Sequence, residues 1–401
     1  MRRVLFFCEA VTLAHVARPV TLAAALDSSC YEVVIACPDR SRAFAGMGPW
    51  PIKSLDSISS ERFLAALASG RPVYDLETLR RYVARDIELI DEVGPDVVIG
   101  DFRLSLSVSA RVAGVPYITM TNAYWSPYYP RIDYPLPVLP MTKLLPLPAA
   151  QRLFRWAAPY AMQGHCRPMN RLRREHGLPS LGSDLRRVYT DADHTLYLDF
   201  PSLFAAVDPP KNHHFLGPVL WSPPTPEPPW WTNLPQDLPL VYVTMGSSGQ
   251  AGILKSVLSA LAELPVVVML STAGAAIPSA LPTNAYAAEY LPGIDAAARS
   301  NLVVCNGGSP TSQQALAAGV PVLGIASNMD QFMNMEAVTG AGAGLLLRAD
   351  RLDIHAIRTA CRRLLTEPSF RDTAQSLSAS TDPAAIQARF NRIVANASSG
   401  R

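Results

Sequence analysis

The chain has 401 residues, of which 49% are hydrophobic and 17% are charged, a composition that suits folded domains and excludes a largely disordered protein. This length exceeds what one hydrophobic core usually organises, so we expect two domains. The formal net charge is only +2, with no basic block beyond a short cluster at 171–177, which argues against a nucleic-acid-binding protein.

Cysteine usage and the N-terminus bear on the compartment. The six cysteines have neither a C-x-x-C pair nor a regular spacing, which favours a reducing environment over a disulfide framework or a zinc site. The first apolar run follows two arginines, as in a signal peptide, but Cys8, Glu9 and His15 interrupt it and no small-residue cleavage site follows. No apolar stretch reaches the roughly 18 residues of a membrane span. We expect a cytoplasmic protein without a transmembrane segment, for which peripheral membrane contact and the oligomeric state stay open.

The first half alternates between strand and helix patterns. In chain order these are strand 3–8, helix 17–28, strand 31–37, strand 95–101, helix 103–114 and strand 115–122. Strand, helix, strand is the unit that builds parallel sheets. We therefore expect residues 1–217 to form an α/β domain.

A proline-rich stretch follows at 218–239. Proline lacks an amide donor and fixes φ, so this stretch can form neither a helix nor a central strand and is predicted to be a linker. The alternation resumes over 240–380, and 381–401 is predicted to be a C-terminal helix that packs back on the first domain. Strand patterns lie at 240–246, 265–270, 285–291, 301–308 and 320–326, with helical patterns at 251–263 and 311–319. The fold class is therefore α/β, with two Rossmann-like parallel-sheet domains facing a central cleft, where such sheets bind ligands.

Residues 121–148 are dense in Tyr, Trp and Pro. They form either a long surface loop packed by its own aromatic rings or the wall of an apolar substrate pocket, since rigid rings give contact area with little entropy loss. On the second interpretation the candidate acceptor-binding residues are Asn122, Tyr124, Trp125 and Tyr128.

A bare stretch of backbone at Gly307 and Gly308 ends one strand and precedes a helix expected near Thr311. Such a junction aims unpaired amides and the positive end of the helix dipole at a ligand, and the hydroxyls of Ser309, Thr311 and Ser312 add donors. The ligand that suits this arrangement is a phosphate or diphosphate. The alternative is a tight turn with a serine or threonine cap.

A second loop of the same type, 241–249, carries Gly246, Ser247 and Ser248. Two such loops could hold one diphosphate between them. Other motifs carry less weight: the glycines at 340–344 follow a helix, the reverse of a dinucleotide fingerprint, and no glycine loop continues into G-K-[ST]. Asp191 and Asp193 superficially suggest a metal site, but we expect a solvated turn there and no metal.

Residues 302–334, with the glycine pair, the following helix and Asp330–Gln331, resemble the donor-binding signature of the GT-B glycosyltransferases, specifically the UDP-glucuronosyl, macrolide and plant natural-product superfamily. The likeness extends to 13–26, 95–101, 217–219 and 241–247. It implies inverting transfer of a sugar from a nucleotide diphosphate sugar, UDP or dTDP, to a hydroxyl or amine, with no metal and no cofactor beyond this co-substrate.

The resemblance also implies roles for particular residues. His15 would be the catalytic base and Asp101 the carboxylate that orients it, while Asp330 and Gln331 would hold sugar hydroxyls. The donor-binding candidates are Gly246, Ser247, Ser248, Tyr290, Leu291, Asn306, Gly307, Gly308, Ser309, Thr311, Gln314, Asp330 and Gln331. The chain departs from the family pattern at Asn306 (usually His), Gln314 (usually Glu) and Gly293 (usually Gln).

We therefore expect a glycosyltransferase for a small, largely apolar acceptor such as a natural product or lipid. The alternatives are a GT-B epimerase and a sugar-nucleotide-binding adaptor that has lost catalysis. A nicotinamide oxidoreductase would need glycines after the first strand, and residues 8–15 contain none.

Overall fold

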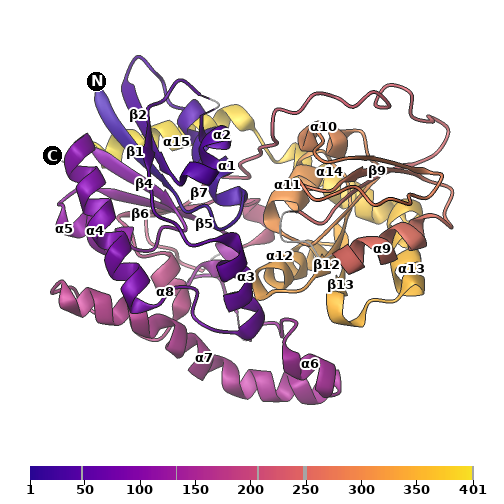
Figure 1. Ribbon diagram of the computed structural model, residues 1–401, viewed down its shortest axis with the longest axis horizontal. Helices are drawn as coiled ribbons and strands as arrows, with labels where there is room; N and C mark the ends of the chain where they lie inside the picture. Colours follow the sequence, from indigo (N-terminus) through magenta and orange to yellow (C-terminus); the bar gives the residue numbers. More distant parts are fainter. Residues whose placement is uncertain (47, 132, 206, 247–250, 400–401) are drawn as a thin grey trace. The chain divides into compact units, whose positions relative to one another are not determined.

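The computed structural model describes residues 1–46, 48–131, 133–205, 207–246 and 251–399, and the chain divides into two compact units (Figure 1). Unit 1 comprises Met1–Asp133, Gln151–Val219 and Asp382–Arg401. Unit 2 comprises Tyr134–Ala150 and Leu220–Thr381.

Unit 1 is built on a parallel sheet of seven strands in the order β3-β2-β1-β4-β5-β6-β7. The strands are β1 (Arg2–Cys8), β2 (Tyr31–Cys37), β3 (Ile52–Ser54), β4 (Val97–Asp101), β5 (Tyr117–Thr121), β6 (His194–Tyr197) and β7 (His213–Phe215). The helices are α1 (Ala14–Ala24), α2 (Arg42–Ala45), α3 (Ser60–Ser69), α4 (Leu76–Val93), α5 (Leu106–Val112), α7 (Leu147–Glu175, of this unit from Gln151 onward), α8 (Leu185–Tyr189) and α15 (Pro383–Ala397).

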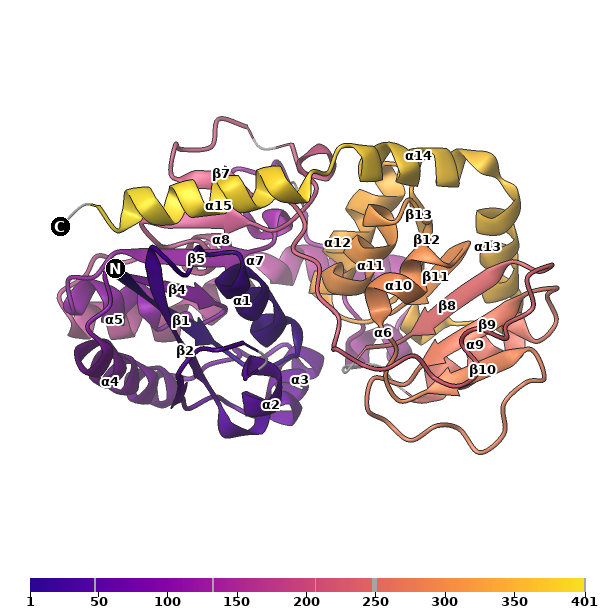
Figure 2. The same cartoon turned by 90° about the horizontal axis from the view of Figure 1, so that it is seen from above.

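Both faces of this sheet are buried, which explains why its central strands are almost continuously apolar. In β1, Val4 and Phe6 face the core formed with α1 and α15, whereas Leu5 and Phe7 face the core formed with α4 and α5. Figure 2 shows α15 running along unit 1 beside β7. Phe390 and the other buried residues of α15 lie in the same hydrophobic cluster as β1 and α1.

Unit 2 repeats the design with a parallel sheet of six strands in the order β10-β9-β8-β11-β12-β13. The strands are β8 (Leu240–Thr244), β9 (Val267–Ser271), β10 (Ala285–Ala288), β11 (Leu302–Cys305), β12 (Val322–Ala326) and β13 (Gly344–Arg348). The helices are α6 (Pro140–Leu144), α9 (Ala251–Leu261), α10 (Gly293–Ala298), α11 (Ser309–Ala317), α12 (Met329–Gly340), α13 (Ile354–Thr366) and α14 (Pro368–Ala379). The predicted α/β class with two Rossmann-like units is therefore confirmed.

The aromatic segment 121–148, predicted to be either a surface loop or the wall of an apolar pocket, is divided between the two units. Residues from Tyr134 onward belong to unit 2, where the amide of Val138 donates to the Ser327 carbonyl at 2.7 Å. Arg348 likewise donates to the Leu136 carbonyl at 2.6 Å. These hydrogen bonds, one from a backbone amide and one from a guanidinium group, join the segment to unit 2, and a local sequence pattern does not encode them.

The proline-rich stretch also differs from a free linker. Residues 216–239, all described, contain no helix or strand, but the division between the units falls at Val219 and Leu220. Trp231 is only 3% exposed, and Trp230 donates its indole N–H to the Ala287 carbonyl at 3.2 Å. The stretch beyond Val219 is therefore packed onto unit 2.

Candidate functional site

The sheet of unit 1 has its switch point between β1 and β4, because the chain leaves β1 toward β2 on one side and β4 lies on the other. Ligands of doubly wound sheets bind at the carboxyl ends of the strands at this point. Cys8 at the end of β1 is in register with Asp101 at the end of β4. His15 lies in the first turn of α1, which follows β1, so the fold brings His15 and Asp101 to one place.

His15 and Asp101 are in direct contact, with Nδ1 2.8 Å from Oδ1. Sequence reasoning missed a third member, Arg18, which donates from Nε to Oδ2 at 2.7 Å and from Nη2 to Oδ1 at 2.8 Å. Arg18 lies three residues after His15, and residues so spaced share one face of a helix. This spacing is the signal that could have identified it.

The network continues beyond Arg18 into the core. Arg18 donates from Nη1 to Asn122 Oδ1 at 3.1 Å, and Asn122 donates from Nδ2 to Asp199 Oδ1 at 2.9 Å. Asn122 is only 7% exposed. Both the oxygen and the nitrogen of its side-chain amide are hydrogen-bonded, so Asn122 belongs to this buried network. We had expected it at the surface of an acceptor site.

The charges favour an ionised Asp101. Burial alone would raise the pKa of Asp101, but the positive charge of Arg18, together with His15 and the hydrogen bonds from both, holds this pKa below its ordinary value. Burial opposes the charge of Arg18 as well, yet the adjacent carboxylate raises the pKa of Arg18. Asp101 Oδ1, at 2.8 Å, favours a proton on His15 Nδ1, whereas the donor Arg18 Nη2 lies 3.0 Å from the same nitrogen. In the tautomer that donates to Asp101, Nε2 is the basic nitrogen.

Phe102, directly after Asp101, covers the imidazole. Its ring stacks on His15 with the centroids 5.0 Å apart and the planes inclined by 19°. The backbone of Phe102 has φ +58°, a left-handed conformation that is costly for a bulky residue and persists only when its surroundings impose it. Asp101 and Arg103, both 0% exposed, hold it from either side.

Arg103 is the centre of a second buried ionic network. It donates to Glu9 Oε2 at 2.7 Å and, from both Nε and Nη2, to Asp86 Oδ1 at 3.0 and 2.9 Å. Its guanidinium also lies 3.6 Å from the ring centroid of Tyr82. Removing one partner of such a buried pair leaves an uncompensated charge, so the network fixes the backbone that carries Asp101 and Phe102.

Aromatic rings surround Phe102. We call Phe63, Tyr74, Phe102, Trp125 and Tyr189 the aromatic cluster. Phe102 contacts the rings of Phe63, Tyr74 and Tyr189 at centroid distances of 5.9, 6.0 and 5.4 Å, and Tyr189 contacts Trp125 at 4.8 Å. Only Trp125 was predicted from sequence, because the other rings come from distant elements.

The remaining acceptor candidates lie outside the aromatic cluster. Tyr124 is 0% exposed and packs between Phe204 and Trp125, so it is a core residue that adjoins the aromatic cluster. The ring of Tyr128 packs on His213 at 5.0 Å, and neither ring belongs to the aromatic cluster.

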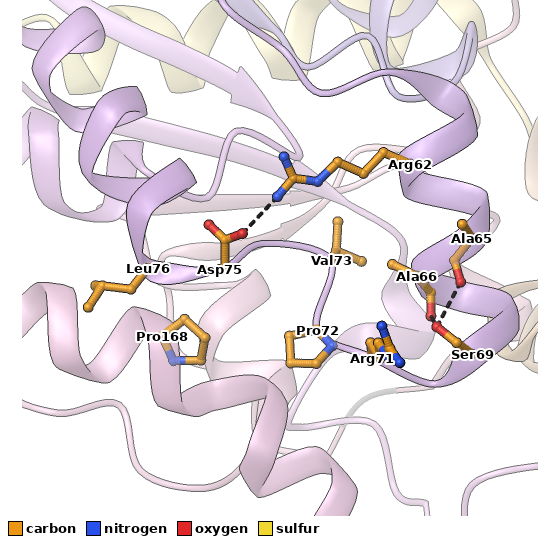
Figure 3. Close-up of a pocket in the computed structure, with 10 residues that line it drawn as sticks. All are labelled: Arg62, Ala65, Ala66, Ser69, Arg71, Pro72, Val73, Asp75, Leu76 and Pro168. Atoms are coloured by element: carbon orange, nitrogen blue, oxygen red, sulfur yellow. Dashed lines mark hydrogen bonds and ion pairs between the residues drawn. The ribbon is translucent and has the colours of Figure 1, made fainter.

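A hollow of about 510 Å³ lies between α3, the loop after it and α7 (Figure 3). Arg62 is turned toward Asp75 and donates to it at 2.9 Å, and the Ser69 hydroxyl donates to the Ala65 carbonyl at 2.8 Å. None of the candidate site residues lines this hollow, and two of its polar side chains, Arg62 and Asp75, pair with each other.

In unit 2 the switch point lies between β8 and β11, with Thr244 and Cys305 in register at the strand ends. The two glycine loops predicted to share a diphosphate therefore lie side by side. A Cβ on Gly246 would be 3.3 Å from Asn306 Nδ2, which shows how closely the loops approach. Ser247 and Ser248 lie outside the described residues.

Gly307 has φ +79°, and a Cβ there would lie 2.8 Å from Met335 Cγ, so only glycine fits. Asn306 Oδ1 accepts from the Gly308 amide at 3.0 Å. Asn334, which sequence reasoning missed, donates to the Gly307 carbonyl and to the Ser312 hydroxyl, each at 2.9 Å. The turn before α11 is thus held from three sides.

The start of α11 presents its dipole at this turn, with Gly308 as the N-cap residue and Ser309 and Thr311 in the first turn. The Ser312 hydroxyl donates to the Gly308 carbonyl at 3.1 Å and so serves the helix itself. Among the described residues the Thr311 hydroxyl has no hydrogen-bond partner, which leaves it available to a ligand.

Asp330 and Gln331 lie in the first turn of α12, directly after β12. Gln331 forms a capping box with Asn328, and its Oε1 accepts from the Ser327 amide at 2.8 Å. A Cβ on Gly307 would be 3.6 Å from the Gln331 carbonyl oxygen, so this helix start adjoins the glycine turn. Asp330 and Gln331 thus begin a helix, and the Gln331 side chain caps it.

Tyr290 and Leu291 follow the edge strand β10, and Gln314 lies in α11. Gln314 donates to the Trp221 carbonyl at 2.5 Å, and a Cβ on Gly293 would lie 3.2 Å from Gln314 Oε1. The Tyr290 hydroxyl lies against Gly274, and Leu291 is 2% exposed.

The paired aspartates are not a solvated turn. Asp191 accepts from Arg111 at 3.0 Å and from Arg173 at 2.5 Å, and Asp193 accepts from the Tyr117 amide at 2.8 Å. Throughout the described part of the chain, no group of three His, Cys, Asp or Glu side chains is placed to hold a metal ion. Nor does any helix formed by those residues have the length and apolar character to cross a membrane.

Two parallel-sheet units, one with a His–Asp pair and the other with glycine turns at its switch point, define the GT-B class of glycosyltransferases. Residues 254–389 match the C-terminal domain of the erythromycin biosynthesis protein CIII-like family. Among solved structures, the chain superposes on Spinosyn Forosaminyltransferase SpnP with a TM-score of 0.71 at 20% identity, covering 98% of this chain and 99% of the other. Spinosyn Rhamnosyltransferase SpnG complexed with thymidine diphosphate gives 0.67 at 21% identity, covering 95% and 96%.

Closer relatives exist in mycobacteria. The PGL/p-HBAD biosynthesis glycosyltransferase of Mycobacterium tuberculosis (strain ATCC 25177 / H37Ra) is 50% identical over 382 residues, 95% of this chain and 89% of that protein. The PGL/p-HBAD biosynthesis rhamnosyltransferase of Mycobacterium bovis (strain BCG / Pasteur 1173P2) is 51% identical over 376 residues, 94% and 83%. An Inactive PGL/p-HBAD biosynthesis glycosyltransferase of the same strain is 49% identical over 260 residues, 65% and 71%. The chain belongs to this family of glycosyltransferases, and the predicted enzyme class is confirmed.

Proposed function

We propose that this glycosyltransferase moves a sugar from a nucleotide diphosphate sugar to a hydroxyl group of a largely apolar acceptor, by an inverting single displacement that uses no metal. The observation that carries the proposal is the contact of His15 with Asp101, held by Arg18 at the switch point of unit 1. A protein that only binds sugar nucleotides has no use for an oriented base.

His15 Nε2 takes the proton of the acceptor hydroxyl as the acceptor oxygen attacks the anomeric carbon. Asp101 keeps the proton on Nδ1 and stabilises the imidazolium that forms. The bond from the anomeric carbon to the diphosphate oxygen breaks as the new bond forms on the opposite face, so the configuration inverts. The imidazolium then returns its proton to solvent.

Unit 2 binds the leaving group, the nucleoside diphosphate of the donor, which departs with the electron pair of the broken bond. The first turn of α11, the Gly308 region and the Thr311 hydroxyl present donors and a positive helix end to the diphosphate. Such preorganised donors stabilise developing negative charge in the role that a metal ion plays in other transferases. Asp330 and Gln331 hold the sugar hydroxyls in this proposal.

The comparisons support particular substrates. A relative named rhamnosyltransferase and a fold neighbour complexed with thymidine diphosphate favour a thymidine over a uridine diphosphate sugar. The names of the relatives favour a role in PGL/p-HBAD biosynthesis. The aromatic cluster beside His15 suits an acceptor with an apolar or aromatic body.

Thermal-shift measurements with dTDP, UDP, GDP and NAD test the donor, because a ligand that binds only the native state raises the melting temperature. Transfer from the preferred donor is then followed with and without EDTA, and the anomeric configuration of the product is read by NMR. Retention of configuration, or loss of turnover in EDTA with rescue by magnesium or manganese, would overturn the mechanism.

A non-catalytic adaptor is the second candidate, favoured by the relative named inactive. It predicts a thermal shift with nucleotide but no transfer to any acceptor. Transfer that depends on His15 excludes it.

A further inference from the structure

The outer face of α7 carries large apolar side chains in the open. Trp156 is 69% exposed, Tyr160 66% and Leu153 45%. They lie three, four or seven residues apart, which places them on one side of a helix. The rings of Trp156 and Tyr160 touch, with centroids 5.8 Å apart. Figure 1 shows α7 as one long continuous helix.

The same face is basic toward both ends of the helix. Arg152, Arg167, Arg171 and Arg174 are exposed and continue the helical spacing of Trp156 and Tyr160. No Asp or Glu occurs from 151 to 174. We call Arg152, Leu153, Trp156, Tyr160, Arg167, Arg171 and Arg174 the α7 outer face.

The opposite side of α7 packs in unit 1, so the exposed side chains of the outer face are not the ones that attach this helix to the domain. Phe154, Cys166 and Leu172 are 7%, 0% and 0% exposed. Arg173 is also buried and donates to Asp191 at 2.5 Å. Arg155, whose Nε lies 2.8 Å from Asp133, is likewise used within the protein.

Of the outer-face arginines, Arg171 lies 3.6 Å from Glu175, the last residue of α7, and Arg174 donates to the Asn170 carbonyl at 3.4 Å. Both side chains are exposed, so these contacts leave most of each guanidinium group open to solvent.

We infer that the α7 outer face docks on an anionic lipid surface. Tryptophan and tyrosine prefer the boundary between headgroups and acyl chains, where one part of the ring system is apolar and another hydrogen-bonds. Arginine reaches from the same depth to lipid phosphates, and between 151 and 174 no Asp or Glu repels them. A helix with apolar anchors and basic residues lies in the plane of the membrane, with its axis parallel to the surface.

Charge complementarity favours a lipid surface over two other partners, a second copy of this chain and a nucleic acid. A second copy would bring the same arginines against each other, which opposes a symmetric contact through this face. Nucleic acid would use the arginines but would leave Leu153, and the apolar bodies of the paired rings, without a matching surface. The inference rests on α7 alone and goes beyond the proposed function.

Vesicle flotation tests it, with full-length protein, phosphatidylcholine vesicles and vesicles in which part of this lipid is replaced by phosphatidylglycerol. The wild type should float with the anionic vesicles and stay behind with the neutral ones. Trp156→Ala with Tyr160→Ala, and separately Arg167→Gln with Arg171→Gln and Arg174→Gln, should each reduce binding, by roughly fivefold per arginine in the second set. Ile354→Ala with Arg362→Gln changes an exposed apolar and an exposed basic side chain of α13 and should leave binding unchanged.

Parallel measurements separate the outcomes. Light scattering of the free protein shows whether Trp156→Ala with Tyr160→Ala dissociates an oligomer, and the melting temperature shows whether the variants fold. Equal binding to both vesicle types, equal binding by wild type and α7 variants, or loss of a dimer in the aromatic variant would each overturn the inference. Transfer to a water-soluble acceptor should be equal in wild type and α7 variants, so failure of the flotation result leaves the proposed function testable on its own.

Discussion

The guanidinium group of Arg18 contacts both carboxylate oxygens of Asp101, at 2.7 and 2.8 Å, while His15 contacts one of them at 2.8 Å. His15, the proposed base, is thus one member of a three-residue group with Asp101 and Arg18. Arg18 does not need to touch the substrate to matter, because it sets the charge and orientation of the carboxylate that orients His15.

Arg18→Met should lower kcat by roughly ten- to a hundredfold and leave the donor KM nearly unchanged. Loss of the cation raises the pKa of Asp101 from its depressed value, so the acid limb of the kcat/KM profile should move to higher pH. Arg18→Lys retains the charge with a single point of contact and should rescue part of the rate. An unshifted acid limb with a lowered melting temperature would mean that Arg18 is only structural.

His15→Ala should lower transfer by roughly 10²- to 10⁴-fold, because the acceptor proton loses its base. Nucleotide binding, measured by calorimetry, should stay within about a factor of two. His15→Gln controls for folding, since an amide can still donate to Asp101 but cannot take a proton. Turnover within a factor of about ten of the wild type would exclude His15 as the base.

Trp125→Ala should raise the acceptor KM and leave the donor KM alone, because Trp125 packs on Tyr189 in the aromatic cluster beside His15. Tyr128→Ala is the matched control from the same loop, since the Tyr128 ring packs on His213. Steady-state kinetics with both substrates varied distinguishes the two. Equal effects of the two substitutions on the acceptor KM would contradict the assignment.

Asn306→Ala should weaken nucleotide binding by about one to two powers of ten, since Asn306 Oδ1 accepts the Gly308 amide and holds the turn before α11. Asn306→Asp keeps the acceptor oxygen but adds a negative charge beside the diphosphate, so it should bind worse than Asn306→Ala. Asn306→His should bind and become pH-dependent between about pH 6 and 7.5. Calorimetric titration that finds Asn306→Ala equal to wild type would leave the glycine amides and hydroxyls as the only diphosphate ligands.

The stability of unit 1 should fall with acidification because of three histidines on β6 and β7. Burial, with the charge of His214, lowers the pKa of His213 to about 4, and burial also lowers the pKa values of His194 and His214. Between about pH 4 and the pKa of about 6.5 that histidine has in an unfolded chain, the unfolded protein binds more protons than the folded protein. The free energy of unfolding therefore rises with pH across this range and reaches its full value above about pH 6.5. Urea unfolding at pH 7.5, 6 and 5 measures the effect.

His213→Gln should flatten this dependence, whereas exposed His176→Gln should not. A midpoint that is constant from pH 7.5 to 5 in the wild type would show that the folded protein tolerates the charged histidines.

The sequence determined the fold class and the positions of the reactive residues along it. Apolar runs broken at regular intervals by helical patterns predict parallel sheets, and His15, Asp101 and Gly307 each follow or end such a run. The resemblance to the GT-B glycosyltransferases singled out His15 and Asp101. Residues that end or follow neighbouring parallel strands must meet at one edge of the sheet, so the two could be expected close together without coordinates. Glycine between a strand and a helix can likewise be read from the local sequence, and it predicts a backbone that a phosphate can approach.

The tertiary structure alone decided which side chains surround them. Phe63, Tyr74 and Tyr189 reach Phe102 from α3, the loop after it and α8, a convergence that depends on strand order and helix packing. Asn334 braces the Gly307 turn from α12, and residues 134–150 join unit 2 through hydrogen bonds. Periodicity records which face of an element is apolar, but not which distant element covers that face, so contacts of this kind appear only once the chain is folded.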